Sequence, residues 1–448
     1  MNDKEKLAAD SLQYHCAPVP GKINILPSKP CETQDDLSLA YTPGVSVPCM
    51  EIHNNPEKVW EYTGRANSVA VVSDGTAVLG LGNIGPEAGM PVMEGKAVLF
   101  KKFAGINAVP LCLGNVFKND GKTDPDKVIA AVRTLEPSFG GINLEDIGAP
   151  ACFTIEPALK KAMGIPVFHD DQHGTAIISL SGILNALKVV GKKIEDCKFV
   201  MNGAGAAGIA CAEYYVSAGA NRDNFTLCDS KGVIHAGRTD LNEQKQRFAH
   251  VTEDRTLADA IRGADVFIGV SVAGAVTPDM VRSMAKDAIV LAMANPTPEI
   301  FPDQALAAGA AVACTGRSDF CNQVNNVLGF PGIFRGALDC RAKDINEAMK
   351  LAASKALSDI VSEPMPADIK ATLVAAYPAE AAKGVFDGEI PLKSTFVIPK
   401  PFDKRVVPRV ARYVVEAAMA TGVAQVQIPD LDAYEKSVAA FIADALKA

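Results

Sequence analysis

A glycine-rich turn, GAGAAG at residues 203–208, constrains the fold of this chain more than any other segment. Apolar residues 198–202 before it indicate a strand, and residues 209–218 after it indicate a helix. In this context the three glycines permit a tight turn, close approach of a pyrophosphate and close packing, in that order. The helix N-terminus can then bind phosphate oxygens through its free N–H groups. The turn predicts a dinucleotide-binding domain with contacts from Gly203, Gly205, Ala206, Ala207 and Gly208.

The segments around this turn alternate between strands and helices. A helix of small residues is predicted at residues 176–190, and further apolar strands are predicted at residues 225–228, 265–270, 288–293 and 310–313. Continuous apolar strands that alternate with helices are typical of a parallel sheet covered on both faces. We therefore predict an α/β protein whose central part is a Rossmann-like, doubly wound parallel sheet.

The two ends of the chain have a different organisation. Residues 68–73 read as a strand followed by an Asp74-Gly75 turn, and residues 77–80 as a second strand, so a hairpin is predicted. Residues 95–102 and 108–113 are strands or buried helices. Near the C-terminus a proline-rich segment, residues 397–409, precedes helices predicted at residues 410–421 and 431–447.

The 448 residues are enough for two or three domains. We expect a second α/β domain over residues 1–165, the Rossmann-like domain over residues 166–390, and a C-terminal segment, residues 391–448, that packs back on the first domain. The active site is expected in the cleft between the two domains.

Cofactor choice depends on the end of the strand after the turn. Asp229 lies 21 residues after Gly208, close to the spacing of a carboxylate that binds the ribose 2′-hydroxyl of NAD. Basic residues just beyond it are able to hold the 2′-phosphate of NADP instead, or to form a solvated loop. NAD and NADP therefore both remain open, and the balance favours NADP. The candidate contacts beyond Asp229 are Ser230, Lys231, Arg238 and Arg247.

Two acidic pairs are candidates for a metal site. Glu145-Asp146 lies in NLEDIGAP, and Asp170-Asp171 lies in FHDDQHGTA just before a helix. Adjacent side chains on a strand point to opposite faces, so Glu145 and Asp146 reach one ion only at a strand end or in a loop. Mg²⁺ and Mn²⁺ prefer such oxygen ligands. Helix capping is the alternative role for Asp171. His169 and His173 have too few partners to form a zinc site.

Several single residues are weaker candidates. Asn295, in NPT after an apolar strand, and Asn325 and Asn326 lie where ligands of parallel sheets bind, although Asn-Pro is also a common turn. Lys96 can serve as a general base if burial lowers its pKa, and Tyr41 can serve as a general acid. Neither stands out by itself among the lysines and tyrosines of the chain.

Composition excludes several classes of function. The net charge of −8, without a long run of Lys or Arg, argues against nucleic-acid binding. The N-terminal residues have no apolar core typical of a secretory signal, and the 11 cysteines form no C-x-x-C pair, which indicates a reducing cytoplasm. No apolar run of the roughly 18 residues needed to cross a membrane is expected.

Taken together, these segments resemble the malic enzymes, especially the short bacterial type. The matching segments follow one another in the same order: YTPGV, DGTAVLGLGNIGPEAGMPVMEGKAVLF, LEDI, FHDDQHGTAIISLSGIL, GAGAAG, DSKG, ANPTPEI, NQVNNVLGFPGIFRG and IPKPFDKRVVPRVA. They cover nearly the whole chain, and the DDQHGTA and LEDI segments are far more specific than the glycine-rich turn.

The resemblance implies oxidative decarboxylation of L-malate to pyruvate and CO2, with reduction of NADP or NAD and a need for Mg²⁺ or Mn²⁺, in a cytoplasmic homodimer. The roles it implies are metal binding by Glu145, Asp146 and Asp171, general base for Lys96, general acid for Tyr41, support of Lys96 by Asp170, substrate contacts from Asn295, Asn325 and Asn326, and cofactor contacts from the turn, Asp229 and Asn295.

One departure from the family pattern concerns the substrate carboxylate. In the larger eukaryotic members an arginine just before the GLG segment contacts it, whereas here the matching place is Thr76-Ala77. Another group must bind that carboxylate. Two other functions stay open at this point: a hydroxy-acid or amino-acid dehydrogenase without decarboxylation, which needs no divalent cation, and a nucleotide-binding protein without catalysis.

Overall fold

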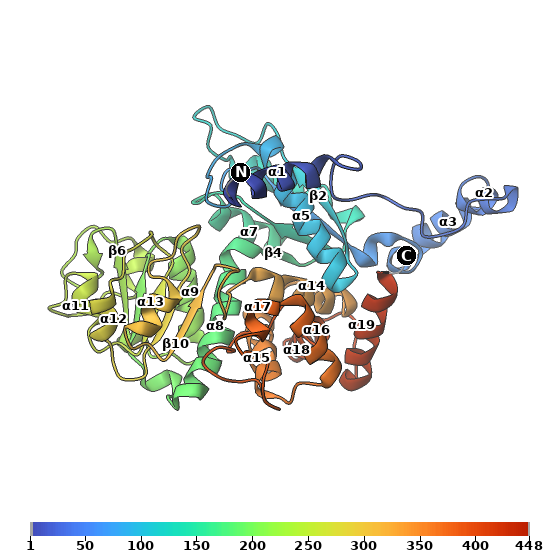
Figure 1. The fold of residues 1–448 in the computed structure, drawn as a ribbon. Coiled ribbons are helices and arrows are strands. Elements are labelled where there is room, and N and C mark those ends of the chain that lie inside the picture. The colour runs from blue at the N-terminus through green and yellow to red at the C-terminus, as the bar shows by residue number, and fades with distance from the viewer. Residues whose placement is uncertain (1–2, 447–448) are drawn as a thin grey trace.

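A computed structural model describes residues 3–446 and contains two sheets with helices packed around them (Figure 1). The first sheet has four parallel strands in the order β2-β1-β3-β4. Its strands are β1 (Ser68–Ser73), β2 (Asn107–Cys112), β3 (Gly141–Leu144) and β4 (Val167–His169). The second sheet has six strands in the order β10-β9-β8-β5-β6-β7, and only the β6–β7 pair is antiparallel. Its strands are β5 (Phe199–Asn202), β6 (Phe225–Asp229), β7 (Gly232–Val233), β8 (Val266–Gly269), β9 (Ile289–Ala292) and β10 (Val312–Thr315). The predicted α/β, Rossmann-like fold class is confirmed.

Both faces of the first sheet are buried. Val69 and Val71 of β1 pack in the same core as α5 (Pro86–Ala104), and Ala70 and Val72 pack on the opposite side with α6 (Pro125–Arg133) and α7 (Cys152–Ala162). This double coverage explains why the strand is a continuous apolar run. It also explains why the predicted hairpin is wrong: β2 and β3 occupy both edges of β1, and residues 77–80 form a turn.

The segment at residues 95–102, left open between strand and helix, belongs to the 19-residue helix α5. Its buried face carries Met93, Lys96, Ala97 and Phe100 at helical spacing. Lys96 therefore points from this helix into the interior of the protein. The segment at residues 108–113 corresponds to strand β2.

The second sheet is also covered on both faces. On one face lie α8 (Asp170–Val190) and α9 (Ala206–Ser217), and on the other lie the short helices α11 (Leu257–Ile261), α12 (Pro278–Arg282) and α13 (Pro302–Ala307). The helix α10 (Glu243–Gln246) follows β7. The predicted strands of this domain correspond to β5, β6, β8, β9 and β10, so its doubly wound organisation follows the sequence pattern.

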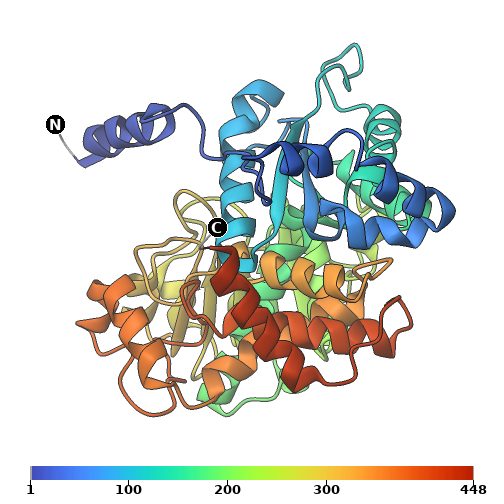
Figure 2. The ribbon, with the colours of Figure 1, turned by 90° about the vertical axis from the view of Figure 1, so that its right-hand side faces the viewer.

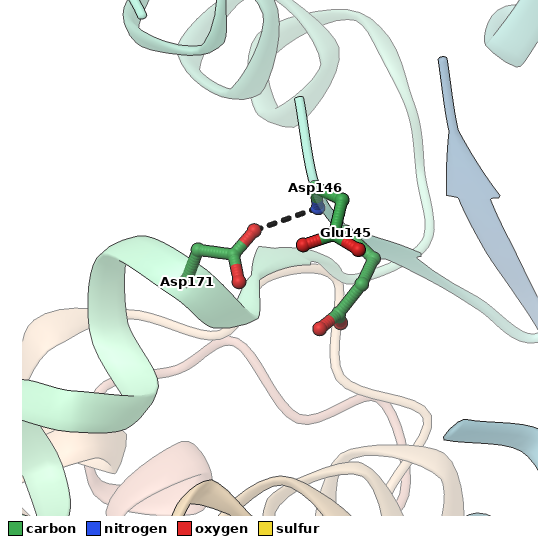
Figure 3. Close-up of side chains that lie close together, drawn as sticks. All are labelled: Glu145, Asp146 and Asp171. Atoms are coloured by element: carbon green, nitrogen blue, oxygen red, sulfur yellow. Dashed lines mark hydrogen bonds between the residues drawn. The ribbon is translucent and has the colours of Figure 1, made fainter. Parts of the chain in front are cut away.

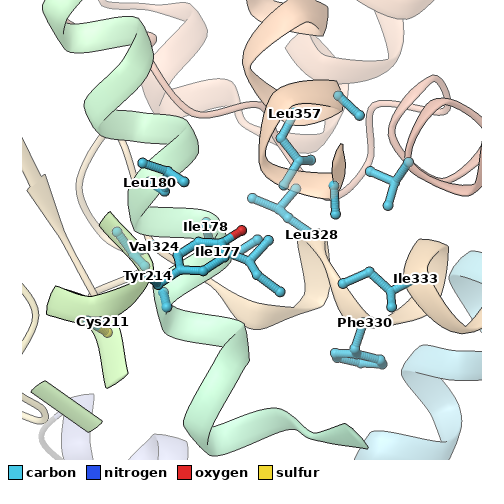
Figure 4. Packing of buried hydrophobic residues seen from close by; sticks show 14 of the residues in the cluster. Ile177, Ile178, Leu180, Cys211, Tyr214, Val324, Leu328, Phe330, Ile333 and Leu357 are labelled. Atoms are coloured by element: carbon cyan, nitrogen blue, oxygen red, sulfur yellow. The ribbon is translucent and has the colours of Figure 1, made fainter. Parts of the chain in front are cut away.

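A helical layer joins the two sheets. α8 contacts α9 and α15 (Glu347–Ser362), and α18 (Val406–Ala420) packs on α15 and on α14 (Phe330–Asp339). Figure 4 shows how apolar side chains of α8, α9, α14 and α15 meet in this core. The remaining C-terminal helices are α16 (Ala367–Ala376), α17 (Pro378–Ala381) and α19 (Leu431–Ala445). α19 contacts α5 and α18 (Figure 2); Lys447, at the predicted end of this helix, lies outside the described residues.

α8 is also long and apolar enough, by length and composition, to cross a membrane, with a mean hydropathy of 1.3. This differs from the expectation that no segment has this property. However, 67% of its most apolar window is buried inside the protein, where the helix packs on α9 and α15. It is therefore a core helix.

The first 54 residues project from this body. α1 (Asp3–Cys16), α2 (Gln34–Ala40) and α3 (Ser46–Asn54) are followed by α4 (Val59–Tyr62) before the first sheet begins. Neither α2 nor α3 contains a buried residue. Figure 1 shows α2 and α3 extending well away from both sheets, and Figure 2 shows α1 projecting on its own.

Candidate active site

Three carboxylates from two elements meet beyond the first sheet (Figure 3). Glu145 and Asp146 directly follow β3, and Asp171 lies in the first turn of α8, which directly follows β4. One oxygen of each lies within 4.8 Å of the others. The backbone N–H of Asp146 donates to Asp171 Oδ2 at 2.7 Å, which ties the two segments together. Glu145, Asp146 and Asp171 form the acid cluster of this site.

The backbone at Asp146 explains how two adjacent side chains serve one cluster. The residue has a φ of 55°, in the left-handed region that aspartate tolerates better than most residues. Because β3 has already ended at Leu144, the alternation of a strand no longer applies. The side chains of Glu145 and Asp146 therefore converge on Asp171, as the sequence analysis requires for a shared ion.

The charges of the acid cluster favour a cation. Burial raises the pKa of Asp146 to about 7, and repulsion from Asp171 adds to the rise. Burial likewise raises the pKa of Glu145 well above its usual range. Asp146 Oδ2 is buried and accepts no hydrogen bond from the described residues. Oxygen ligands whose ionised form lacks a partner suit Mg²⁺ or Mn²⁺, so the residues fit the metal that the resemblance implies.

Lys96 lies beside the acid cluster. Its Nζ is 2.6 Å from Asp170 Oδ2, 2.9 Å from Glu145 Oε1 and 4.3 Å from the centre of the Phe330 ring. Burial by itself lowers the pKa of Lys96, but the negative charges of Asp170 and Glu145 outweigh it and raise the pKa above its usual value. The direction is opposite to the one expected from burial alone, because the sequence does not reveal that two carboxylates contact the ammonium group.

Two of the three predicted asparagines lie near these groups through different contacts. Asn326 Nδ2 donates to Asp170 Oδ2 at 3.4 Å, so it borders the Lys96 site. Asn325 Oδ1 instead accepts from the backbone N–H of Val327 and caps a short turn. Asn295, after β9, is exposed. An added Cβ at Gly80, in the loop before α5, would lie 3.8 Å from the Asn295 carbonyl oxygen, so that loop borders Asn295.

A buried carboxylate that the sequence analysis missed holds the loop of Asn295. Glu299 Oε2 accepts from the N–H of Ala294 at 3.1 Å, and Oε1 accepts from the N–H of Ser271 at 2.7 Å. The side chain thus joins the ends of β8 and β9. A glutamate in ANPTPEI carries no motif of its own, so only its complete burial identifies this role.

Thr76, which stands near the place of the family arginine, is used within the protein. Its Oγ1 donates to Asp74 Oδ1 at 2.6 Å and accepts from the Gly148 N–H at 2.8 Å. The N–H of Ala77 donates to the Asp146 carbonyl at 3.0 Å. These bonds fasten the loop after β1 to the acid cluster.

The two histidines near the acid cluster have different surroundings. His173 Nε2 lies 2.9 Å from Glu156 Oε2, and its Nδ1 lies 3.1 Å from Lys350 Nζ. His169 is buried, with Nδ1 3.7 Å from Asp171 Oδ2. Local hydrogen bonding therefore accounts for His173, and His169 packs behind the acid cluster.

The glycine-rich turn opens α9 as predicted. Gly203 has a φ of 117°, and a Cβ added to it would lie 2.4 Å from the Val270 carbonyl oxygen. At Gly208 an added Cβ would lie 1.8 Å from the Gly203 carbonyl oxygen, so this glycine packs against the turn itself. At Gly205 an added Cβ would meet nothing within 4 Å, which leaves room beside the helix N-terminus.

Gly208→Ala is expected to destabilise the protein by at least about 1–3 kcal/mol, because the methyl group has no space. Gly205→Ala is expected to leave the melting temperature unchanged and to weaken binding of the dinucleotide. Thermal unfolding and the fluorescence of bound reduced cofactor measure both variants. Equal melting temperatures for the two variants would contradict the packing role of Gly208.

Asp229, at the end of β6, is surrounded by basic side chains. Arg238 donates to both of its oxygens at 2.8 and 3.1 Å, and Lys245 Nζ donates at 2.6 Å. Burial opposes ionisation, but these hydrogen bonds hold the pKa of Asp229 well below its usual range. Lys231 Nζ pairs with Asp240, and Arg247 pairs with Glu243 on the surface. Lys245 was missed by the sequence analysis, which considered Arg247 two residues away.

Tyr41 lies away from the acid cluster. It follows α2 in the projecting segment and is 71% exposed. Figure 1 shows α2 far from α5, the helix of Lys96. The structure therefore brings together Lys96, Asp170, Asn326 and the acid cluster within one chain, and leaves Tyr41 outside.

Comparison with known proteins gives the family of this chain. Residues 20–160 match the family model described as "Malic enzyme, N-terminal domain", and residues 172–373 match "Malic enzyme, NAD binding domain". The chain belongs to the malic enzyme family. The resemblance expected from the ordered motifs is confirmed.

Individual malic enzymes are similar over nearly the whole chain. The NADP-dependent malic enzyme of Haemophilus influenzae is 52% identical over 98% of this chain, which spans only 56% of that longer protein. The bifunctional malic/malolactic enzyme of Bacillus subtilis is 54% identical, with coverage of 90% of this chain and 91% of that one. The crystal structure of a malic enzyme from Pyrococcus horikoshii has a TM-score of 0.84 at 41% identity and covers 98% of this chain and 97% of that chain.

Proposed function

We propose that this chain is a malic enzyme that converts L-malate to pyruvate and CO2 with reduction of NAD(P). The observation that carries the proposal is the meeting of the acid cluster, Lys96 and Asp170 at one place. A dehydrogenase without decarboxylation has no need of a divalent cation, so the acid cluster favours the malic enzyme reaction over that alternative. Family membership supports the same conclusion.

Glu145, Asp146 and Asp171 are the proposed ligands of Mg²⁺ or Mn²⁺, and the glycine-rich turn is the proposed site of the dinucleotide pyrophosphate. When bound, the cation supplies a positive charge that polarises the oxygens of the substrate, and the nicotinamide accepts a hydride.

Lys96 and Asp170 are proposed to move the proton of the malate hydroxyl. Lys96 accepts a proton only when it is neutral, so its own proton must first move to a neighbour. Asp170 is suited to this role: it lies 2.6 Å away, and burial raises the pKa of its carboxyl. Asn326, which donates to Asp170, holds that carboxylate in place. Lys96 is thus the proposed general base and Asp170 its positioning partner.

Binding of the remaining substrate groups is assigned to asparagines. We propose that Asn295 contacts both malate and the nicotinamide side of the cofactor, because its side chain makes no hydrogen bond to residues 3–446. Asn326 borders Lys96, and Asn325 holds the turn that presents it. Because Thr76 is occupied by Asp74 and Gly148, these amides are the proposed substitutes for the family arginine.

NADP is the proposed preferred cofactor. Arg238 and Lys245 already neutralise Asp229, so this carboxylate is a poor acceptor for a ribose hydroxyl, and the two cations favour a 2′-phosphate. Ser230, Lys231 and Arg247 are further proposed contacts on the same side.

Arg238→Gln is expected to raise KM for NADP by about 10–100-fold and KM for NAD much less, because it removes a charge-assisted hydrogen bond. Arg247→Gln is the matched control, because Arg247 pairs with Glu243 on the surface, and a small change is expected. Steady-state kinetics with each cofactor measure both. An equal loss with NAD and NADP would exclude Arg238 as a determinant of cofactor choice.

Reduced-cofactor formation with L-malate and Mn²⁺, with and without a chelator, tests the proposed function. Pyruvate and CO2 are measured in the same reaction. Chelator-sensitive formation of all three products is expected. Cofactor reduction without CO2 would indicate a simple dehydrogenase, and no reduction with either cofactor would contradict the proposal.

We further propose a soluble, cytoplasmic homodimer with small-molecule substrates and no nucleic-acid or membrane partner. The proposed domains are residues 1–165, 166–390 and 391–448. The contacts of α19 with α5 support the return of the last segment to the first domain.

A further inference from the structure

The environment of Lys96 contains no hydroxyl that can serve as a proton donor. Its ammonium group contacts two carboxylates and the ring of Phe330. Five of the eight tyrosines of the chain are engaged elsewhere among the described residues. They are Tyr214 with Ser354, Tyr215 with Ser179, Tyr377 with Phe386 and Phe402, Tyr413 with Asp359, and Tyr434 with Asp339. The other three, Tyr14, Tyr41 and Tyr62, all lie before the first sheet.

Of these three, Tyr41 has the least local involvement. The ring of Tyr14 contacts His15, and the ring of Tyr62 lies 5.3 Å from Lys58 Nζ. The Tyr41 hydroxyl makes no hydrogen bond to residues 3–446, and its side chain is 71% exposed. Its backbone is nevertheless fixed, because its N–H donates to Leu37 and its carbonyl accepts from Val45. An ordered backbone that presents an unpaired tyrosine to the outside is suited to contact another molecule.

Residues 23–54, which we call the N-terminal arm, expose an apolar surface. Ile25 is 99% exposed and Leu39 is 74% exposed, and Leu26, Leu37, Val47 and Met50 are also exposed. The helices of the arm, α2 and α3, have seven and nine residues and bury none of them. Helices this short are not stable in water without packing. The apolar surface of the arm therefore requires a partner.

A second exposed apolar surface borders the active site. Leu79 and Leu81, in the loop after β1, are 71% and 69% exposed. The same loop is bound to the acid cluster through the hydrogen bond from the Ala77 N–H to the Asp146 carbonyl. An apolar segment that covers Leu79 and Leu81 is thus held beside Asp146 and Lys96.

We infer that the N-terminal arm of a second copy of this chain packs on the loop of Leu79 and Leu81 and places its Tyr41 in the Lys96 site. In a two-fold dimer the exchange is reciprocal, so each site combines the Lys96 of one copy with the Tyr41 of the other. The inference rests on the proposed function, in which a tyrosine is the proton donor. It also accounts for the exposure of both apolar surfaces in a single chain.

Heterodimers of two inactive variants test this inference. Tyr41→Phe and Lys96→Ala chains with different affinity tags are co-expressed, and the heterodimer is purified through both tags. With exchange, one of its two sites holds both intact residues, so about half of wild-type activity is expected. Without exchange, each site lacks one residue, and activity no higher than in the parent variants would overturn the inference. A fully active Tyr41→Phe homodimer would overturn it as well.

A measurement that does not depend on activity separates this inference from the proposed function. Leu39→Asp puts a charge in the apolar surface of the arm and is expected to convert the dimer to a monomer in sedimentation velocity. Val251→Asp, at a 90% exposed apolar position in the second domain, is the matched control and should remain dimeric. An unchanged dimer with Leu39→Asp would overturn the inference. If the doubly tagged wild type shows no malate-dependent activity while Leu39→Asp is monomeric, the proposed function fails and the exchange of arms stands.

Discussion

Lys96→Ala is expected to lower the rate of malate oxidation by about 10²–10⁴-fold, the usual contribution of a positioned general base. The side chain is buried on α5, and its Nζ contacts Asp170 and Glu145. No other lysine of the described chain contacts the acid cluster or Asp170, so none can replace it. The measurement is the initial rate of cofactor reduction at saturating malate, Mn²⁺ and cofactor. Lys101→Ala, at an exposed position of the same helix, is the matched control and should be fully active.

Loss of activity through unfolding must be separated from loss of the base. Lys96→Ala leaves Asp170 and Glu145 without their cation, which costs stability as well. A small primary amine in solution is expected to restore part of the rate, because it fills the space of the ammonium group. A folded Lys96→Ala variant that oxidises malate at the wild-type rate would remove Lys96 from the mechanism.

The second large effect is expected from Asp171→Asn, which should raise the Mn²⁺ concentration for half-maximal activity by at least about 100-fold, since loss of residues that merely support a ligand costs 10–100-fold. Asparagine keeps the shape but removes the charge. It also keeps an oxygen that can accept from the Asp146 N–H, so the local fold is preserved. Of the acid cluster, Asp171 is the most exposed member, with 41% of its side chain accessible, so its substitution disturbs the core least.

Binding of Mn²⁺ measured by electron paramagnetic resonance gives a readout besides activity. Asp126→Asn, an exposed carboxylate in the first turn of α6, is the matched control and should bind Mn²⁺ as the wild type does. Equal Mn²⁺ affinity for Asp171→Asn and the control would exclude Asp171 as a ligand.

The second domain was predictable from the sequence because its signals are local. The turn at Gly203 and Gly208 needs particular backbone geometry and space, and the surrounding strands are apolar because both faces of their sheet are covered. The hairpin after β1 was wrong because the Asp74-Gly75 turn signal is the same whether the next segment pairs with β1 or not. The parallel neighbours β2 and β3, which decide the outcome, come from residues 34 or more positions further along the chain.

The site was only partly predictable for a similar reason. The sequence contains Glu145, Asp146 and Asp171 as pairs, but the positive φ of Asp146 that makes the side chains converge is not visible in it. The pKa of Lys96 depends on two carboxylates from distant segments. The position of Tyr41 was beyond the sequence analysis, because the arm that carries it buries no residue and so leaves no pattern that fixes its direction.

The helix α8 has one further consequence for the chemistry of this protein. It is a single helix of 21 residues, about 30 Å long, and its first two residues are Asp170 and Asp171. Because they are neighbours on a rigid rod, the carboxylate that holds Lys96 and the one that belongs to the acid cluster cannot shift independently. The other end of the rod is fastened in the core, where Asn185 donates to the Val397 carbonyl at 2.9 Å. Proton transfer and cation binding therefore share one mechanical coordinate, and a change of packing at the far end of α8 alters both in the same stroke.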